Sequence, residues 1–210
     1  MYIGSKPADK VLTASDITDG IISSAKIADG TIVNDDVNAS AAIVASKLSG
    51  AGITEYDSWR LTAALSMSAS SETLITANWE RQDDATFDKI GTGMSESSGI
   101  FTFPSTGKWL IKLFATVKIG GSGSARYVRL KIFGTTDNSA YNAIAAGITN
   151  IPSITSGQDD NQVYCDTLFD CTDTANRKVA LYYQVADSAD IDSSSSFNMM
   201  SFSFMKLGDT

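Results

Sequence analysis

The sequence predicts an all-β chain, with a jelly-roll sandwich head of about nine to ten strands on an extended, repetitive N-terminal stalk. Three observations support this fold class. Aliphatic residues recur at every fifth position before residue 54, apolar and polar residues alternate in many segments after it, and no segment has a clear helical period. All nine Phe and all three Trp follow residue 55, so we expect the aromatic core to lie in the head.

The repetitive stalk is expected to cover residues 12–53. Its aliphatic residues are five positions apart, with one extra residue after Val37, and turn-forming segments such as 18–20 and 28–30 lie between them. A five-residue period matches neither a helix nor a strand, so a single copy has no face with which to build a core. Several identical chains could turn these side chains toward a common axis. The predicted stalk core is Leu12, Ile17, Ile22, Ile27, Ile32, Val37, Ile43, Leu48 and Ile53. The alternative is a disordered linker rich in Ala, Ser and Asp.

The head is expected to cover residues 54–210. Alternating patterns predict half-buried strands at 59–67, 109–119, 127–133, 163–171, 179–185 and 197–207, with weaker candidates at 72–79, 85–90 and 99–103. Polar loops are expected at 135–139, 150–161 and 187–196. Such loops either bind a partner through adaptable hydrogen bonds or only keep the assembly soluble.

Composition argues against several classes of protein. The chain has 24 acidic and 16 basic residues, and a formal net charge of -8 repels nucleic acid. No apolar run approaches the roughly 18 to 20 residues of a spanning helix, and the start of the chain has no pattern of a signal peptide, so we expect neither membrane insertion nor export by its own signal. The only cysteines, Cys165 and Cys171, lie in one predicted strand, which keeps them too far apart for a disulfide.

The residues that usually carry catalysis are scarce. The chain has no histidine, which removes the usual general base and the commonest metal ligand. Carboxylates at 83–84, Asp88 and Glu96 could in principle flank a glycosidic bond, but we expect them to be solvated surface charges. The segment 187–192 holds three aspartates and is expected to be an acidic loop, with a structural calcium site as the weaker alternative. We therefore assign no catalytic, cofactor-binding or metal-binding residue.

One part of the head resembles a known family. The segment GIFTFPSTGKW at 99–109, which follows FDKIG at 87–91, resembles the central Gly-x-Phe-x-x-Pro-x-x-Gly-x-aromatic signature of the complement and tumour-necrosis-factor globular heads. The final run, 197–207, is similar to the C-terminal strand of that family. The resemblance implies a jelly-roll head that forms trimers. Two departures are Trp109, where the family usually has Tyr, and the pentad repeat, which stands where many members have a collagen-like stalk.

The stalk resembles a second group of proteins. The segment IADGTIVNDDVNASAAI at 27–43, with YIGSKPA at 2–8, looks like the N-terminal parts of fibre proteins from tailed bacteriophages. This resemblance implies a homotrimeric virion protein on the outside of the particle, either a tail fibre or a fibre that decorates the capsid. Residues 1–11 would then be a virion-docking peptide, with Tyr2, Ile3, Gly4 and Pro7 in contact with other virion proteins. The head would bind a host-surface glycan or protein.

Two other functions stay open at this point. A secreted ligand or adhesion protein with a complement-like head is the main alternative. A carbohydrate-cleaving fibre is the other, although no residue supports it.

Overall fold

The computed structural model describes residues 13, 17–38, 40–43, 52–69, 71–82, 87–120, 123–194 and 196–210. The chain divides into two compact units, residues 1–48 and 49–210. In the first unit the described residues contain two short 3-10 helices, η2 (Ser24–Lys26) and η3 (Asn34–Asp36), joined by turns.

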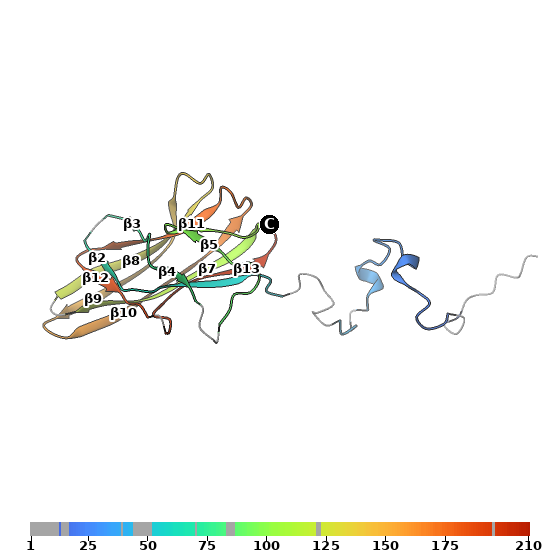
Figure 1. Cartoon of the computed structure of the whole chain (residues 1–210), viewed down its shortest axis with the longest axis horizontal. Coiled ribbons are helices and arrows are strands. Elements are labelled where there is room, and N and C mark those ends of the chain that lie inside the picture. The colour runs from blue at the N-terminus through green and yellow to red at the C-terminus, as the bar shows by residue number, and fades with distance from the viewer. Residues whose placement is uncertain are drawn as a thin grey trace, which may run out of the picture. The chain divides into compact units, whose positions relative to one another are not determined.

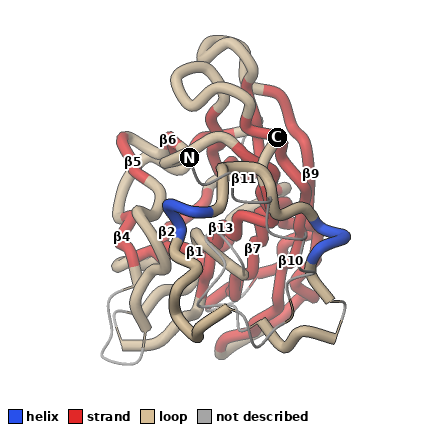
Figure 2. Tube along the Cα trace, turned by 90° about the vertical axis from the view of Figure 1, so that its right-hand side faces the viewer, coloured by secondary structure: helices blue, strands red, loops and turns tan. Residues whose placement is uncertain are grey.

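The second unit is a sandwich of two antiparallel sheets, as predicted (Figure 1). The larger sheet has the order β2-β12-β7-β13-β1-β4, and β10 pairs with the other side of β7. Its strands are β1 (Tyr56–Leu61), β2 (Leu65–Met67), β4 (Trp79–Arg81), β7 (Gly107–Gly120), β10 (Gln158–Cys171), β12 (Ala189–Ile191) and β13 (Met200–Gly208). In Figure 2 the strands β1, β13, β7 and β10 follow one another across this sheet.

The smaller sheet has the order β5-β6-β11-β8-β9, and β3 pairs with β11. Its strands are β3 (Thr73–Leu74), β5 (Ser95–Ser97), β6 (Ile100–Thr102), β8 (Gly123–Thr135), β9 (Asn142–Ile154) and β11 (Lys178–Val185). The described residues thus form more strands than the nine to ten expected, because several strands have only two or three residues.

The family-like segment lies at the centre of the core. The ring of Phe101 is fully buried and lies 5.0 to 5.4 Å from the rings of Trp59, Trp79, Phe202 and Phe204. Such aromatic pairs add to the free energy gained from burial alone. Gly99 has a φ of +84°, and a Cβ there would collide with the carbonyl oxygen of Ile75. The glycine of the signature therefore allows β6 to begin close to the segment after β3.

The long predicted strands are confirmed at β7, β8, β10, β11 and β13, but the prediction of a single strand at 59–67 is wrong. Residues 59–67 form two strands, because the backbone leaves the sheet after Leu61. The N–H of Thr62 donates to the carbonyl of Asn78, whose φ is 65°, over 2.9 Å. Of the weaker candidates, 99–103 holds β6 and 72–79 holds only β3 and the start of β4. In 85–90 the described residues contribute one bridge, from Ile90 to Tyr56.

The prediction of a loop at 150–161 is wrong, because most of it belongs to β9 and β10. The first half of β9 contains three Ala and one Gly, which have low β-propensity, and its second half contains Pro152. Both features fit its place at the sheet edge, where a missing N–H is tolerated. A Cβ on Gly147 would lie 2.5 Å from the carbonyl oxygen of Tyr164 in β10, so this close approach requires glycine. The loop predicted at 187–196 also contains a strand, β12.

Candidate functional site

The apolar residues of the stalk are exposed in the single chain. Seven of the nine predicted core residues are described, and their exposed fractions run from 38% at Ile27 to 57% at Ile32. Leu12 and Leu48 lie outside the described residues. Isolated surface aliphatics are common, but a regular series of them is a feature of surfaces that bind another chain. The inward orientation of these residues stays a prediction.

The described stalk repeats every ten residues, which is two of the predicted pentads. The carbonyls of Thr18, Ala28 and Asn38 each accept a hydrogen bond from the N–H three residues later. Between these turns lie η2 and η3, which are also ten residues apart. Successive aliphatic residues of the five-residue period therefore follow a turn and a 3-10 helix in alternation. The spacing of the aliphatic residues does not distinguish these two local structures.

The outer face of the larger sheet carries a row of apolar side chains. Leu168 of β10 is opposite Leu110 of β7, which is opposite Met205 of β13, and this residue is opposite Tyr56 of β1. Leu168 is 67% exposed, more than any other large hydrophobic side chain among the described residues. The row therefore crosses four strands and ends in a leucine that no part of the described chain covers.

A second apolar pair lies on the same face, four residues further along β10 and β7. Tyr164 of β10 is opposite Phe114 of β7, and its side chain is 55% exposed. Between this pair and the first row, Asp166 is opposite Lys112, and both are exposed. The opposite charges of this pair stabilise the sheet itself, and the exposed apolar side chains on either side of it are free to contact another chain.

A hollow opens at one end of this face. Leu168, Phe169 and Leu207 line it together with Lys108, Asp170 and Gly208, and its volume is about 290 Å³. Ile144 and Ile148 of the neighbouring strand β9 are also exposed. The outer face of β10, β7 and β13 thus presents the exposed apolar side chains of Tyr164 and Leu168 beside this hollow.

The sequence prediction missed this surface. Tyr164 and Leu168 were included in the predicted strand 163–171, but they share their face with Asp166 and Asp170. The signal in the sequence is the pair of large apolar residues on the polar face of an amphipathic strand.

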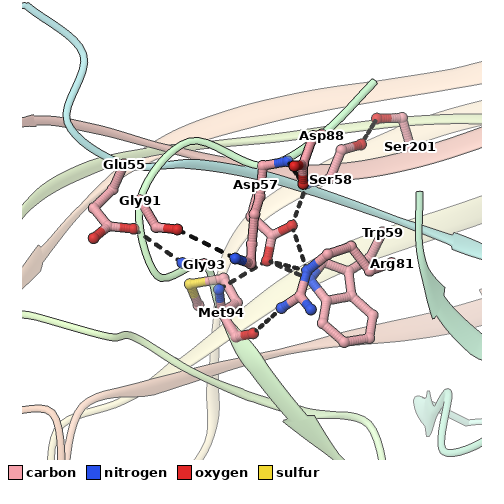
Figure 3. A network of polar contacts seen from close by, with 11 residues as sticks. Glu55, Asp57, Ser58, Trp59, Arg81, Asp88, Gly91, Gly93, Met94 and Ser201 are labelled. Atoms are coloured by element: carbon pink, nitrogen blue, oxygen red, sulfur yellow. Dashed lines mark hydrogen bonds and ion pairs between the residues drawn. The ribbon is translucent and has the colours of Figure 1, made fainter. Parts of the chain in front are cut away.

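The most connected polar network of the head has a structural role (Figure 3). The buried carboxylate of Asp57 accepts hydrogen bonds from Trp59 Nε1, Arg81 Nε and the N–H of Met94 at 2.8 to 2.9 Å. Its neighbour Glu55 accepts from the N–H of Gly93 at 3.0 Å. These bonds attach the loop before β5 to β1 and to the residue before it. The carboxylate of Asp57 is buried, and its hydrogen-bonding capacity is used within the protein.

The two described carboxylates of the set considered for catalysis, Asp88 and Glu96, bind backbone N–H groups close to them in the sequence. Asp88 accepts a hydrogen bond from the N–H of Lys89, and Glu96 accepts one from the N–H of Gly99. Residues 83 and 84 lie outside the described part of the chain. The described carboxylates of this set therefore act as local acceptors for backbone N–H groups.

A lysine side chain, Lys118, neutralises one carboxylate of the acidic segment 187–192. Asp192 forms an ion pair of 2.6 Å with Lys118, and this hydrogen bond lowers the pKa of its carboxyl group. In the described residues no three His, Cys, Asp or Glu side chains come together as a metal site requires. Asp159 and Asp160 lie in β10, where successive side chains point to opposite faces.

The two cysteines are free and buried, as predicted. Burial raises the pKa of the Cys165 thiol to about 11, and burial also raises the pKa of Cys171. Both thiols are therefore protonated near neutral pH and behave as small apolar side chains.

The predicted docking residues Tyr2, Ile3, Gly4 and Pro7 lie outside the described residues. In the described part of the chain, no helix is long and apolar enough to cross a bilayer.

Comparison with solved structures identifies the fold of the head. The Eiger TNF from S. frugiperda has a TM-score of 0.55 and 10% identity, covering 76% of this chain and 96% of that chain. Murine APRIL at pH 5.0 has a TM-score of 0.51 and 14% identity, covering 73% of this chain and 98% of that chain. No protein-family model and no curated protein matches the sequence. The head therefore has a jelly-roll fold similar to those of tumour-necrosis-factor-like proteins, and the likeness concerns the fold alone.

Proposed function

We propose that this chain is the subunit of a homotrimeric fibre on the outside of a tailed bacteriophage, attached to the virion by its N-terminus and binding the host surface with its head. The observation that carries the proposal is the presence of two uncovered apolar surfaces in one chain. One is the aliphatic series of the stalk, and the other is the outer face of β10, β7 and β13. A head and a stalk that both need partners fit an assembly of identical chains.

Burial of these side chains would stabilise the assembly substantially. Burying a large aliphatic side chain completely contributes about 1.5 to 3 kcal/mol. The described stalk residues are about half exposed, so each would contribute on the order of 1 kcal/mol per chain on assembly. The number three comes from the two resemblances, and the jelly-roll fold of the head is consistent with it.

Binding is preferred to catalysis for a chemical reason. The chain has no histidine to act as a general base. The carboxylates of Asp57, Glu96 and Asp192 already form hydrogen bonds or ion pairs within the protein. A sandwich that presents strands and loops on a rigid core is well suited to recognition.

Location on a virion is tested by immunogold electron microscopy of intact phage particles, with an antibody against residues 57–210. Label at the tail supports a receptor-binding tail fibre, and label over the capsid supports a head decoration. Absence of label from particles that contain the chain in their protein profile would contradict an exterior position.

A secreted ligand is the second candidate, and the similarity of the fold to Eiger TNF and to murine APRIL favours it. The two candidates differ in what the head contacts. Saturable binding of the purified chain to animal cells, with no association with phage particles, would favour the ligand over the fibre.

A further inference from the structure

A basic cluster lies on the outer face of the smaller sheet, although the chain as a whole carries a charge of -8. It contains Arg126 and Arg129 of β8, which flank Tyr127. The Arg129 guanidinium carbon lies 4.3 Å from the centre of the Tyr127 ring, and that of Arg126 lies 6.0 Å from it. Two guanidinium groups are thus gathered around one aromatic ring, an arrangement that cation–π attraction stabilises.

A β-bulge creates this cluster. Ala125 is opposite Ile151 and Val128 is opposite Thr149, so Arg126 and Tyr127 together face a single residue of β9. Ala125 and Val128 are fully buried, whereas Arg126 is exposed and Tyr127 is half-buried. Bulges change the direction of side chains and are frequent next to functional sites. Here the extra residue places an arginine on the outer face, where a regular strand would turn it inward.

Neither guanidinium has a carboxylate partner among the residues that the structure describes. Arg129 donates instead to the neutral Oε1 of Gln184 in β11, at 3.2 Å. Further along the same face, Lys131 is paired with Glu72, so its charge is compensated. The N–H of Ala186, just after β11, donates to the carbonyl of Tyr127. Asp187 is the next residue, and it is the carboxylate nearest in sequence to this end of β11. At this end of the face, Arg126 and Arg129 therefore carry positive charge that no described carboxylate compensates.

The surface beside the arginines is an aromatic and polar track. From Arg129 and Gln184 it passes to Lys131 and Tyr182, which are opposite each other. The Tyr182 ring stacks on the buried Phe133, with 4.1 Å between the ring centres, and is held in place by it. Residues 127 to 131 of a strand span about 13 Å. Aromatic rings with a polar tip beside amide groups suit the mixed apolar and hydroxylated faces of a sugar chain.

The cluster also lies at the end of the head that is remote from the stalk junction. Residues 52 and 54 lie beside Lys206 and Gly208, close to the start of β7 at Gly107. The other end of β7, at Gly120, leads into β8, and a strand of this length spans about 43 Å. The arginines are therefore near the end of the head opposite to the one where the chain enters it.

We propose that the outer face of β8 and β11 binds a carboxylated polysaccharide, with Arg126 and Arg129 as the groups that bind the carboxylates. A guanidinium binds a carboxylate through paired, charge-assisted hydrogen bonds. A polysaccharide meets both the arginines and the two tyrosine rings beside them, Tyr127 and Tyr182. This inference gives a ligand class to the binding role proposed above, and rests on that role only for its biological setting.

The experiment measures binding of the full-length protein to immobilised polygalacturonate, with fully methyl-esterified polygalacturonate as the uncharged polymer of the same backbone. We expect binding to the acidic polymer that weakens as salt increases, because exposed charges are screened. Each lost charge-assisted contact should lower affinity about tenfold, so the Arg126→Gln/Arg129→Gln variant should bind roughly 100-fold more weakly.

Two single variants serve as controls. Lys89→Gln removes one positive charge from the loop before β5, outside this face, and should retain wild-type affinity. Asp187→Asn removes a negative charge beside the cluster and should raise affinity. Thermal melting of each variant verifies that it is folded, and light scattering verifies its mass.

Four results would overturn the proposal: no binding by the wild type, equal binding of the esterified polymer, unchanged affinity of the double variant, or binding of dextran sulfate without binding of polygalacturonate. A monomeric protein that binds polygalacturonate through the two arginines would refute the trimer and leave this inference intact. A trimer that does not bind the polymer would refute this inference and leave the trimer intact.

Discussion

Replacing Leu168 by alanine should weaken the trimer without unfolding the head. Leu168 is 67% exposed in the single chain, so its removal costs the head little packing. If the side chain is buried on assembly, its loss removes about two thirds of 1.5 to 3 kcal/mol, or about 1 to 2 kcal/mol per copy. Three copies act together, so the trimer should lose about 3 to 6 kcal/mol.

This loss can be measured as a shift in dissociation. The dissociation constant of a trimer into monomers should rise by roughly 10² to 10⁴, which moves the midpoint concentration by about 10- to 100-fold because the midpoint varies as the square root of that constant. Mass photometry of a dilution series of the full-length chain gives the midpoint. The melting temperature of the dissociated chain should change little.

A matched control removes an aliphatic side chain from the other sheet. Ile100 of β6 is opposite Ala180 of β11, on the outer face of the smaller sheet. Ile100→Ala should leave the trimer midpoint unchanged. An unchanged midpoint for Leu168→Ala, or an equal shift for both variants, would refute the assignment of the β10 face to assembly.

Further predictions concern the stalk and the thiols. Ile27→Asp should make the first fifty residues sensitive to protease, because three carboxylates would meet without partners in one layer; unchanged resistance would refute the inward orientation. Deletion of residues 22–31 removes one complete ten-residue repeat and should preserve the melting temperature of the stalk better than deletion of 22–26, which joins two turns in succession. Equal melting temperatures would show that the pentad is the structural unit. Cys165 and Cys171 should react very slowly with Ellman's reagent at pH 8, because burial raises the pKa of both thiols. With a pKa of about 11, the Cys165 thiol is only about 0.1% thiolate at that pH. Rapid reaction before unfolding would contradict their burial.

The fold could be predicted because the core strands carry strong patterns. Strand β7 alternates from Trp109 to Ile119, and its inward residues are almost completely buried. Strand β9 was missed because its composition is set by close contact with β10 at Gly147 rather than by the burial of large side chains. A close approach of two backbones leaves no periodic signal in either strand.

The candidate surfaces were only partly predictable. The stalk period identified the exposed aliphatic residues, whereas the alternation of turns and 3-10 helices depends on backbone hydrogen bonds. Leu168 lies between aspartates, so its face of β10 had the pattern of a solvated surface. The approach of Arg126 and Arg129 to one ring depends on a bulge, and the register of β8 against β9 determines where that bulge occurs.

The mass of the intact protein in solution tests the central claim most directly. Light scattering coupled to size-exclusion chromatography should give three chains of 22.2 kDa, 66.6 kDa in all. A mass near 22.2 kDa across the accessible concentration range would contradict both the stalk assembly and the role of the β10 face.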